Sequence, residues 1–262
     1  MISSTSNERV KYVSSLHRTG VRRQERVFVL EGVRLVEEAL AAGLVPQLVL
    51  GNPDLLERSA RGRELWGRLR GFNALAVTEN VLRHVSDTVT PQGVVAVMPA
   101  AESKRPADLG HLALVLDGVR DPGNVGTILR SAEASGVTTV VLTPDCVDAY
   151  NPKVLRGAMG AHFHLNLMIE LGWPEIGELL GQRPIWVAAA AEGMRHFEVD
   201  WTGSQSLVVG GEASGASEEA RRRASGFVHI PMVGRAESLN AAVAASVILF
   251  EALRQRTVSG LD

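Results

Sequence analysis

Short apolar segments alternate with amphipathic ones along the whole chain. In the first hundred residues the apolar segments are VFVL (27–30), QLVL (47–50), ALAV (74–77) and VVAVM (94–98). Runs of this length predict strands, because a buried strand is apolar on both faces. The stretches between them have helical spacing of apolar positions and predict helices at about 32–42, 54–70 and 79–86. The first part of the chain therefore predicts a small α/β domain.

The second part of the chain repeats this alternation with stronger apolar runs. We expect strands at 112–119, 138–143, 164–169, 184–190, 206–211 and 227–232. We expect helices between and after them, at about 124–135, 152–160, 174–181, 216–225 and 238–255. Continuous apolar strands separated by helices are typical of an open parallel sheet with helices on both faces. The predicted fold class is α/β.

A segment rich in proline, alanine and charge separates the two parts. Residues 99–110 (PAAESKRPADLG) have neither helical nor strand periodicity and predict a linker. The expected organisation is a first domain at 1–98, the linker at 99–110 and a second domain at 111–262. A chain of 262 residues is long enough for two such domains with cores of their own.

Composition excludes several classes of protein. Hydrophobic residues make up 45% and charged residues 21%, which excludes a disordered chain. The single cysteine, Cys146, excludes a disulfide framework and a zinc site built from cysteines. No apolar stretch reaches the roughly 18–20 residues of a membrane helix. The N-terminal segment also lacks the apolar core of a secretory signal, so we expect a cytoplasmic protein without membrane contact.

The net charge of −2 conceals an asymmetry. Residues 1–100 carry 13 Lys and Arg against 10 Asp and Glu, whereas residues 101–262 carry 14 against 19. Only Glu8 and Glu25 oppose the basic side chains of the first 26 residues, which are Arg9, Lys11, Arg18, Arg22, Arg23 and Arg26. A basic arm of this kind attracts phosphate backbones without reading sequence. Charge alone leaves an ordinary solvated surface equally open.

Three unusual loops follow predicted strands of the second part, where open α/β sheets bind their ligands. In DGVRDPGNVGTILRSAEASG (117–136), a tight turn precedes Asn124, a candidate helix cap. In VVGGEASGAS (208–217), paired glycines let the backbone approach a ligand closely. In IPMVGRAESLNAAVAASVILF (230–250), Ser238 is a natural cap, and Asn240 beside an apolar helix suggests a polar contact. Each loop alone is also explained as an ordinary helix start.

Two familiar kinds of cofactor site are missing from these loops. None of them is the GxGxxG fingerprint of dinucleotide-binding proteins or a P-loop, which argues against nicotinamide and ATP as ligands. A nucleotide-dependent oxidoreductase is therefore a disfavoured alternative. His162 and His164 have no third metal ligand nearby in the sequence, so we expect them to be structural and expect no metal.

Taken together and in this order, the three loops resemble one family. DPGNVGTILRSAEASG, VVGGEASG and IPMVGRAESLNAAVAA resemble the signature motifs of the SpoU/TrmH-type RNA 2′-O-ribose methyltransferases of the SPOUT superfamily. ERVFVLEGVRLVEEAL (25–40) and TPQGVVAVM (90–98) are similar to the L30e-like substrate-binding domain of many members, and NPKVLRGAMGAHFHLNL (151–167) to their middle helix and strand. Two departures are small-residue exchanges: Ala213, where glycine is frequent, and Ala241-Ala242, where Val-Ser is common.

The resemblance implies a fold and a cofactor. It implies a C-terminal SPOUT α/β-knot, a trefoil-knotted parallel sheet at 111–262, preceded by a smaller L30e-like α/β domain at 1–98 that binds the RNA substrate. It implies S-adenosylmethionine as the cofactor, held near Ala189, Gly210, Gly211, Ile230, Met232 and Leu239. It also implies a homodimer with the site near the interface. The apolar helix 238–255 is the candidate for that interface, and packing on its own sheet is the alternative.

The resemblance further implies methyl transfer to a ribose 2′-hydroxyl, with 23S ribosomal RNA as the expected substrate. The alternatives are transfer RNA and a non-catalytic RNA-binding or ribosome-binding protein of the same fold. In this interpretation the RNA is bound by basic residues of the first domain, namely Arg9, Lys11, Arg18, Arg22 and Arg23.

Five polar residues match the family's catalytic positions: Arg130, Asn124, Glu212, Ser238 and Asn240. A guanidinium stays protonated at neutral pH, so we expect Arg130 to bind a substrate phosphate or stabilise the developing alkoxide rather than act as a base. Glu212 is expected to pair with Arg130 or to hold its own loop. Asn124 and Asn240 are expected to orient Arg130 or the ribose.

Overall fold

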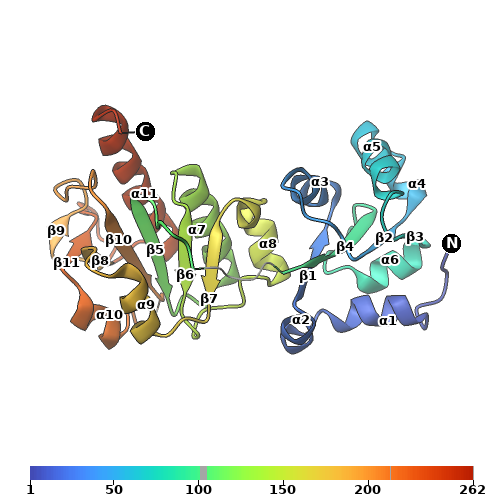
Figure 1. Cartoon of the computed structure of the whole chain (residues 1–262), viewed down its shortest axis with the longest axis horizontal. Coiled ribbons are helices and arrows are strands. Elements are labelled where there is room, and N and C mark those ends of the chain that lie inside the picture. The colour runs from blue at the N-terminus through green and yellow to red at the C-terminus, as the bar shows by residue number, and fades with distance from the viewer. Residues whose placement is uncertain (101–104, 213, 262) are drawn as a thin grey trace. The chain divides into compact units, whose positions relative to one another are not determined.

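The computed structural model of this protein describes residues 1–100, 105–212 and 214–261. The chain forms two compact units (Figure 1). Unit 1 comprises Met1–Glu102 and Tyr150–Arg156, and unit 2 comprises Ser103–Ala149 and Gly157–Asp262. Part of the segment predicted as a linker, 101–104, lies outside the described residues. No helix in the described ranges is both long and apolar enough to cross a membrane.

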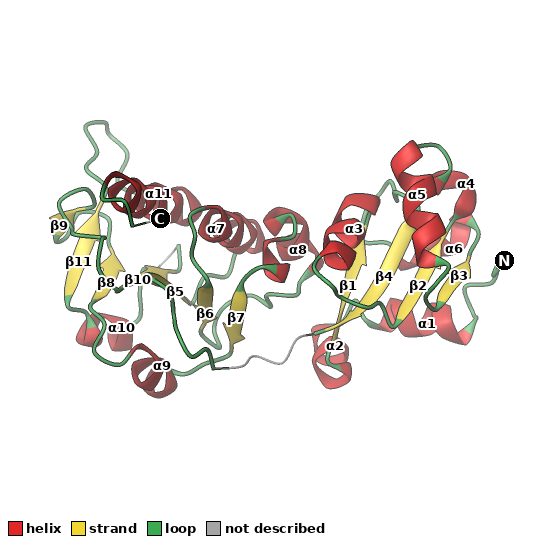
Figure 2. Cartoon of the chain, turned by 45° about the horizontal axis from the view of Figure 1, so that its top comes forward, coloured by secondary structure: helices red, strands yellow, loops and turns green. Residues whose placement is uncertain are grey.

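Unit 1 is a small mixed sheet between two layers of helices (Figure 2). Its strands lie in the order β1-β4-β2-β3, with β4 antiparallel to both neighbours and β2 parallel to β3. They are β1 (Val27–Glu31), β2 (Leu48–Gly51), β3 (Ala74–Ala76) and β4 (Val94–Pro99). The helices are α1 (Glu8–Ser15), α2 (Thr19–Glu25), α3 (Val33–Ala41), α4 (Pro53–Leu56), α5 (Ala60–Leu69) and α6 (Glu79–Val85). These strands confirm the four predicted in this part.

The single helix predicted over 54–70 is wrong, because the chain forms α4 and α5 there. Ser59 starts the second helix by accepting a hydrogen bond from the Gly62 N–H at 2.9 Å. A serine side chain that satisfies a backbone donor in this way favours a helix start over a helix interior.

The basic N-terminal segment is helical rather than an extended arm. Its apolar side chains Val10, Val13 and Leu16 are buried in the core of unit 1. Arg22 is also buried, at 3% exposure. Its guanidinium donates to the carbonyl oxygens of Leu16 at 2.7 Å and His17 at 2.9 Å. The expectation that Arg22 contacts RNA is therefore wrong, because its donors hold the turn between α1 and α2.

Unit 2 is a parallel sheet, as predicted. Its strands lie in the order β7-β6-β5-β10-β8-β11-β9, and the neighbouring strands run parallel. They are β5 (Leu112–Asp117), β6 (Thr139–Leu142), β7 (Asn166–Ile169), β8 (Ile185–Ala188), β9 (Met194–Arg195), β10 (Gln205–Gly210) and β11 (Gly226–His229). From β5 the chain builds outward to β7 on one side, and the later strands lie on the other side. The junction of β5 and β10 is thus a topological switch point, where open α/β sheets bind ligands. The trefoil knot stays a prediction.

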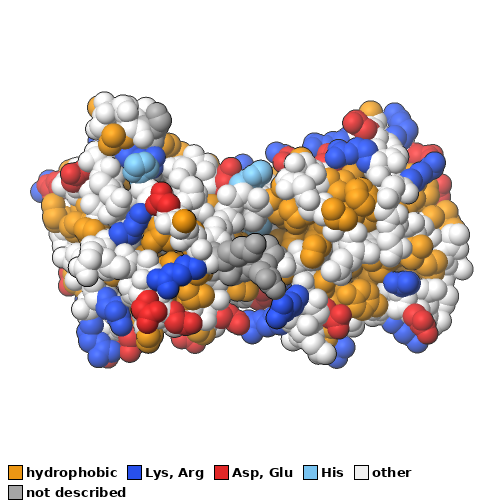
Figure 3. Space-filling view, in the orientation of Figure 1, with side chains coloured by type: hydrophobic (Ala, Val, Ile, Leu, Met, Phe, Trp, Pro, Cys, Tyr) orange, Lys and Arg blue, Asp and Glu red, His pale blue; other side chains and the backbone are white. Residues whose placement is uncertain are grey.

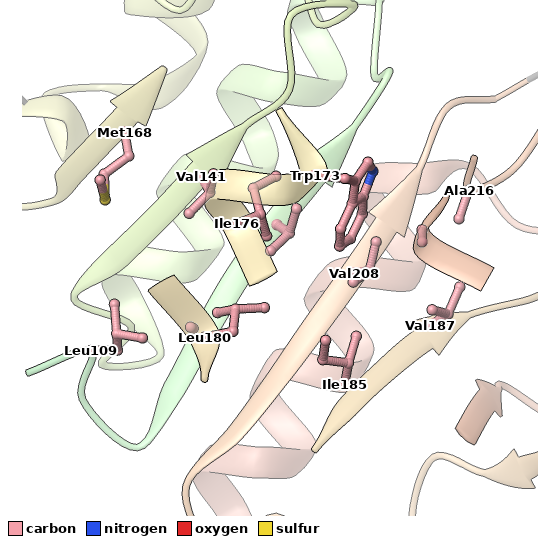
Figure 4. Packing of buried hydrophobic residues seen from close by; sticks show 13 residues of the cluster. Leu109, Val141, Met168, Trp173, Ile176, Leu180, Ile185, Val187, Val208 and Ala216 are labelled. Atoms are coloured by element: carbon pink, nitrogen blue, oxygen red, sulfur yellow. The ribbon is translucent and has the colours of Figure 1, made fainter. Parts of the chain in front are cut away.

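Helices cover both faces of this sheet. They include α7 (Pro122–Ala134), α9 (Trp173–Leu180), α10 (Glu218–Arg223) and α11 (Ala241–Val258), and the short 3-10 helix Ala161–Phe163 precedes β7. Most of α8 (Pro152–Ala158) belongs to unit 1. In both views α7 and α11 lie side by side on one face and α9 and α10 lie on the other (Figures 1 and 2). Under α9, Trp173, Ile176 and Leu180 pack onto strand residues such as Val141 and Val208 (Figure 4). This core fixes the strand ends that carry the candidate site.

Two helices of unit 2 start at residues other than those predicted. The cap of α7 is Asp121, not Asn124, because the Asp121 carboxylate accepts from the Asn124 N–H at 2.8 Å. The cap of α11 is Asn240, not Ser238, because Asn240 Oδ1 accepts from the N–H groups of Ala242 at 2.9 Å and Val243 at 3.3 Å. The side chains of Asn124 and Ser238 are therefore not used as helix caps.

Candidate active site

A cavity of about 840 Å³ lies at the carboxyl ends of β8, β10 and β11. This volume is in the range of sites that bind a cofactor-sized molecule. Its wall comes from the loops after these three strands, from the start of α11 and from Arg221 of α10. The six residues predicted to hold the cofactor all line it: Ala189, Gly210, Gly211, Ile230, Met232 and Leu239.

The loop after β10 folds back on itself so tightly that only glycine fits at two positions. A Cβ atom on Gly210 would lie 2.1 Å from the Ala216 nitrogen, and one on Gly211 would lie 2.5 Å from the Gly118 carbonyl oxygen. The Gly215 N–H closes the turn by donating to the Gly211 carbonyl at 2.9 Å. Backbone therefore forms this part of the cavity wall, which lets a ligand approach closely. Ala213, one of the departures from the family pattern, lies outside the described residues.

Three polar side chains from separate segments of the chain form one hydrogen-bonded series: Asn124 in the first turn of α7, Glu212 in the loop after β10 and Asn240 at the cap of α11. Asn240 Nδ2 donates to Asn124 Oδ1 at 2.9 Å, and Asn124 Nδ2 donates to Glu212 Oε1 at 2.6 Å. The capping role of Asn240 directs its Oδ1 at the backbone of α11, so its Nδ2 faces Asn124. Asn124 must then accept with Oδ1 and donate with Nδ2. The start of α11 thus fixes the orientation of the Asn240 and Asn124 side chains and, through them, of the Glu212 carboxylate.

The remaining two predicted catalytic residues lie in different places. Ser238 lines the cavity next to Leu239. Arg130 is exposed on α7 and is not among the described residues that line the cavity. It lies six residues beyond Asn124, which in a helix means about 9 Å along the axis and roughly 120° around it. The expected pairing of Glu212 with Arg130 is not seen, since the Glu212 carboxylate binds Asn124 instead.

One residue that supports the site was missed by the sequence reasoning. Asp117 is buried at the end of β5, and its carboxylate accepts from the Ser217 N–H at 2.6 Å and from Trp173 Nε1 at 3.3 Å. Its main-chain oxygen accepts from the Gly211 N–H at 3.0 Å. Asp117 therefore holds both ends of the loop that carries Glu212 by hydrogen bonds. An acidic residue ending an otherwise apolar strand was the signal available in the sequence.

A second missed feature is an ion pair on the cavity wall. Arg221 Nη2 lies 2.7 Å from Glu192 Oε2, and both residues line the cavity. Neither belongs to the three motif strings. Glu192 closely follows the predicted strand 184–190, and this position at a strand end was the only sequence signal for it.

Comparison with known proteins assigns these features to a family. The SpoU rRNA Methylase family matches residues 111–250 of the chain. The chain belongs to the SpoU rRNA methylase family. In front of this region, residues 7–96 match the MRM3-like substrate binding domain. The family and the fold class predicted from the sequence are thereby confirmed.

Individual SpoU relatives match nearly the whole chain. The 23S rRNA (guanosine(2553)-2′-O)-methyltransferase RlmP of Bacillus subtilis is 32% identical, over 95% of this chain and 97% of that protein. The SpoU methyltransferase AviRb of Streptomyces viridochromogenes, solved with its cofactor AdoMet, is 29% identical with a TM-score of 0.87, over 96% of this chain and 98% of that one. A solved RNA 2′-O ribose methyltransferase is 31% identical with a TM-score of 0.83, over 98% and 99%.

Proposed function

We propose that this chain transfers the methyl group of S-adenosylmethionine to a ribose 2′-hydroxyl of ribosomal RNA, with 23S ribosomal RNA as the expected substrate. Membership of the SpoU family supports an S-adenosylmethionine-dependent RNA methyltransferase, and the name of the Bacillus subtilis relative supports the 2′-hydroxyl and the ribosomal substrate. The observation that carries the proposal is the hydrogen-bonded chain from Asn240 through Asn124 to Glu212, beside a cavity walled by glycine backbone.

The cavity fits S-adenosylmethionine in size and in chemistry. Ile230, Met232 and Leu239 provide apolar surface for the adenine ring, and Gly210 and Gly211 leave backbone groups open to the cofactor. When bound, the cofactor supplies a methyl group on a positively charged sulfur. Relatives of this family have been solved with AdoMet bound, which supports the same cofactor here.

The protein's own residues contribute positioning. Asn124 and Asn240 hold the Glu212 carboxylate in one orientation, and Ser238 and Asn240 present a hydroxyl and an amide to the same cavity. These groups can hold a ribose so that its 2′-oxygen faces the methyl group, and such alignment lowers the barrier of a displacement reaction. The proton of the 2′-hydroxyl then leaves to a neighbouring acceptor or to water.

We assign Arg130 to an interface between two copies of the chain. On α11, Val243, Val247 and Phe250 are exposed at 48%, 37% and 47%, at the spacing of one helix face. The neighbouring α7 exposes Arg130, and Ser131 contacts Ser246 at 2.7 Å where the two helices meet. A second copy over α7 and α11 would cover the apolar face and bring Arg130 to the partner's site. There its charge would bind a substrate phosphate or stabilise the developing alkoxide.

Unit 1 is proposed to grip the RNA. Arg9, Lys11, Arg18 and Arg23 are exposed in its N-terminal segment. Lys and Arg side chains also gather over α5 (Figure 3), where Arg61, Arg63 and Arg68 are exposed. Cationic side chains of this kind bind phosphates independently of sequence. The match with a substrate binding domain supports this role, and the bacterial relative supports a cytoplasmic location.

The test is a map of 2′-O-methylated nucleotides in ribosomal and transfer RNA from cells with and without the protein. We expect one methylated ribose in 23S ribosomal RNA to disappear without the protein and to return with the wild-type chain. The Asn240→Ala variant should not restore it. A loss confined to transfer RNA would contradict the proposed substrate, and an unchanged map would contradict the activity.

A further inference from the structure

The cavity wall carries few charges. Among the described residues that line it, the ionisable side chains are Glu192, Glu212 and Arg221. The Glu212 carboxylate accepts from Asn124 and belongs to the polar chain of the site. Arg221 is therefore the cation available to a ligand along the described part of this wall, with Glu192 beside it.

Arg221 is held in a defined position. Its Nη2 lies 2.7 Å from Glu192 Oε2, and its guanidinium carbon lies 4.6 Å from the centre of the Phe227 ring. Stacking on an aromatic ring fixes the plane of a guanidinium while leaving its edges open to acceptors. The two side chains remain 44% and 51% exposed, so a molecule in the cavity can reach both.

The amino-acid end of S-adenosylmethionine carries an α-carboxylate and an α-ammonium. A carboxylate that leaves water needs a cationic partner, and a guanidinium binds it through two parallel hydrogen bonds. An arginine next to a glutamate is complementary to such a zwitterion. We infer that Arg221 binds the α-carboxylate of the cofactor and that Glu192 binds its α-ammonium. This inference rests on the proposed cofactor site and assigns a role to two residues outside the three motifs.

The test compares two ligands of the full-length protein by calorimetry. S-adenosylhomocysteine has the amino-acid end, and 5′-methylthioadenosine lacks it. Arg221→Gln should weaken binding of S-adenosylhomocysteine by about tenfold or more, the value of one charge-assisted pair, and change binding of methylthioadenosine by less than about twofold. Arg222→Gln is the matched control, because Arg222 is on the same helix, pairs with Glu219 and is not among the lining residues. It should leave both affinities unchanged.

Glu192→Gln is a second, independent variant in an exposed loop. It should weaken S-adenosylhomocysteine binding several-fold and leave methylthioadenosine binding unchanged. If Arg221→Gln fails to fold, this variant still tests whether the pair binds the amino-acid end of the cofactor. Equal losses for both ligands would show that the pair only shapes the wall, and no loss for either would show that it does not contact the cofactor. Either result overturns the inference. A wild-type protein that binds neither ligand would instead overturn the proposed cofactor site.

Discussion

Asn124 Nδ2 donates to Glu212 Oε1 across 2.6 Å, although 88 positions separate the two residues in the chain. The contact joins the first turn of α7, which follows β5, to the loop after β10, and these two strands are neighbours in the sheet. Asn240 completes it from the start of α11. The orientation of one carboxylate thus depends on a helix cap and on the order of the strands.

Replacing Asn124 should separate catalysis from cofactor binding. In Asn124→Ala the Glu212 carboxylate loses its donor, and we expect the rate of methyl transfer to fall about 100-fold, as for loss of one positioned polar group at a reacting centre. Because Asn124 is not among the residues that line the cavity, the affinity for S-adenosylhomocysteine should change less than about threefold. Single-turnover kinetics and calorimetry measure the two quantities. Glu133→Ala, elsewhere on α7, is the control, and an unchanged rate in Asn124→Ala would contradict the role of the contact.

Mixing two inactive variants tests the assignment of Arg130 to the partner's site. Arg130→Ala and Asn124→Ala should each be nearly inactive alone. If Arg130 of one copy serves the site of the other, a mixed dimer contains one site with both residues intact. An equimolar mixture after exchange should then recover about a quarter of the wild-type activity. Absence of recovery in a mixture that sediments as a dimer would show that Arg130 does not act across an interface.

Much of the fold and part of the site can be predicted from the sequence, because they depend on local pattern. The apolar runs predict the parallel strands. The paired glycines after β10 predict backbone that a ligand can approach closely, and in the structure Gly210 and Gly211 line the cavity. The exact helix caps are harder to predict, because Ser238 and Asn240 are both residue types that cap helices well, and in the structure Asn240 is the cap of α11. Arg221 and Glu192 could not be predicted, since their contact depends on how a helix and a loop meet in three dimensions.

Arg22 and its exposed neighbours should respond differently to substitution. Arg22→Gln removes the donors from the buried carbonyl oxygen of Leu16 and the partly buried one of His17, so we expect the free energy of unfolding to fall by about 2 kcal/mol. The triple variant Arg9→Gln, Lys11→Gln, Arg18→Gln should leave stability nearly unchanged. The affinity of this variant for RNA should depend less steeply on salt: the magnitude of the slope of log affinity against log salt concentration should decrease by about 2. Urea denaturation and RNA titrations at several salt concentrations measure both effects, and an unchanged slope would remove these side chains from the RNA interface.

His162 should make the stability of the protein depend on pH. Burial lowers the pKa of His162 from 6.5 to about 4, while its Nε2 lies 2.7 Å from the Ala149 carbonyl oxygen. Between these two values the unfolded chain binds a proton that the folded chain does not, so the free energy of unfolding falls as the pH decreases. From pH 7 to pH 5 the contribution is about 2 kcal/mol.

The comparison of wild type with His162→Gln isolates this effect. The variant should lose about 2 kcal/mol less stability than the wild type between pH 7 and pH 5, as measured by urea denaturation. Equal losses in the two proteins would show that His162 is not buried in its neutral form.

Mass spectrometry of nucleosides can locate the methyl group that the protein transfers. Ribosomal RNA is incubated with the purified protein and S-adenosylmethionine that carries a deuterated methyl group. We expect the label in a single 2′-O-methylated nucleoside, with the wild-type chain and not with Asn240→Ala. Label on a base, or equal label with both proteins, would contradict a site in which Asn240, Asn124 and Glu212 direct the methyl group to a ribose oxygen.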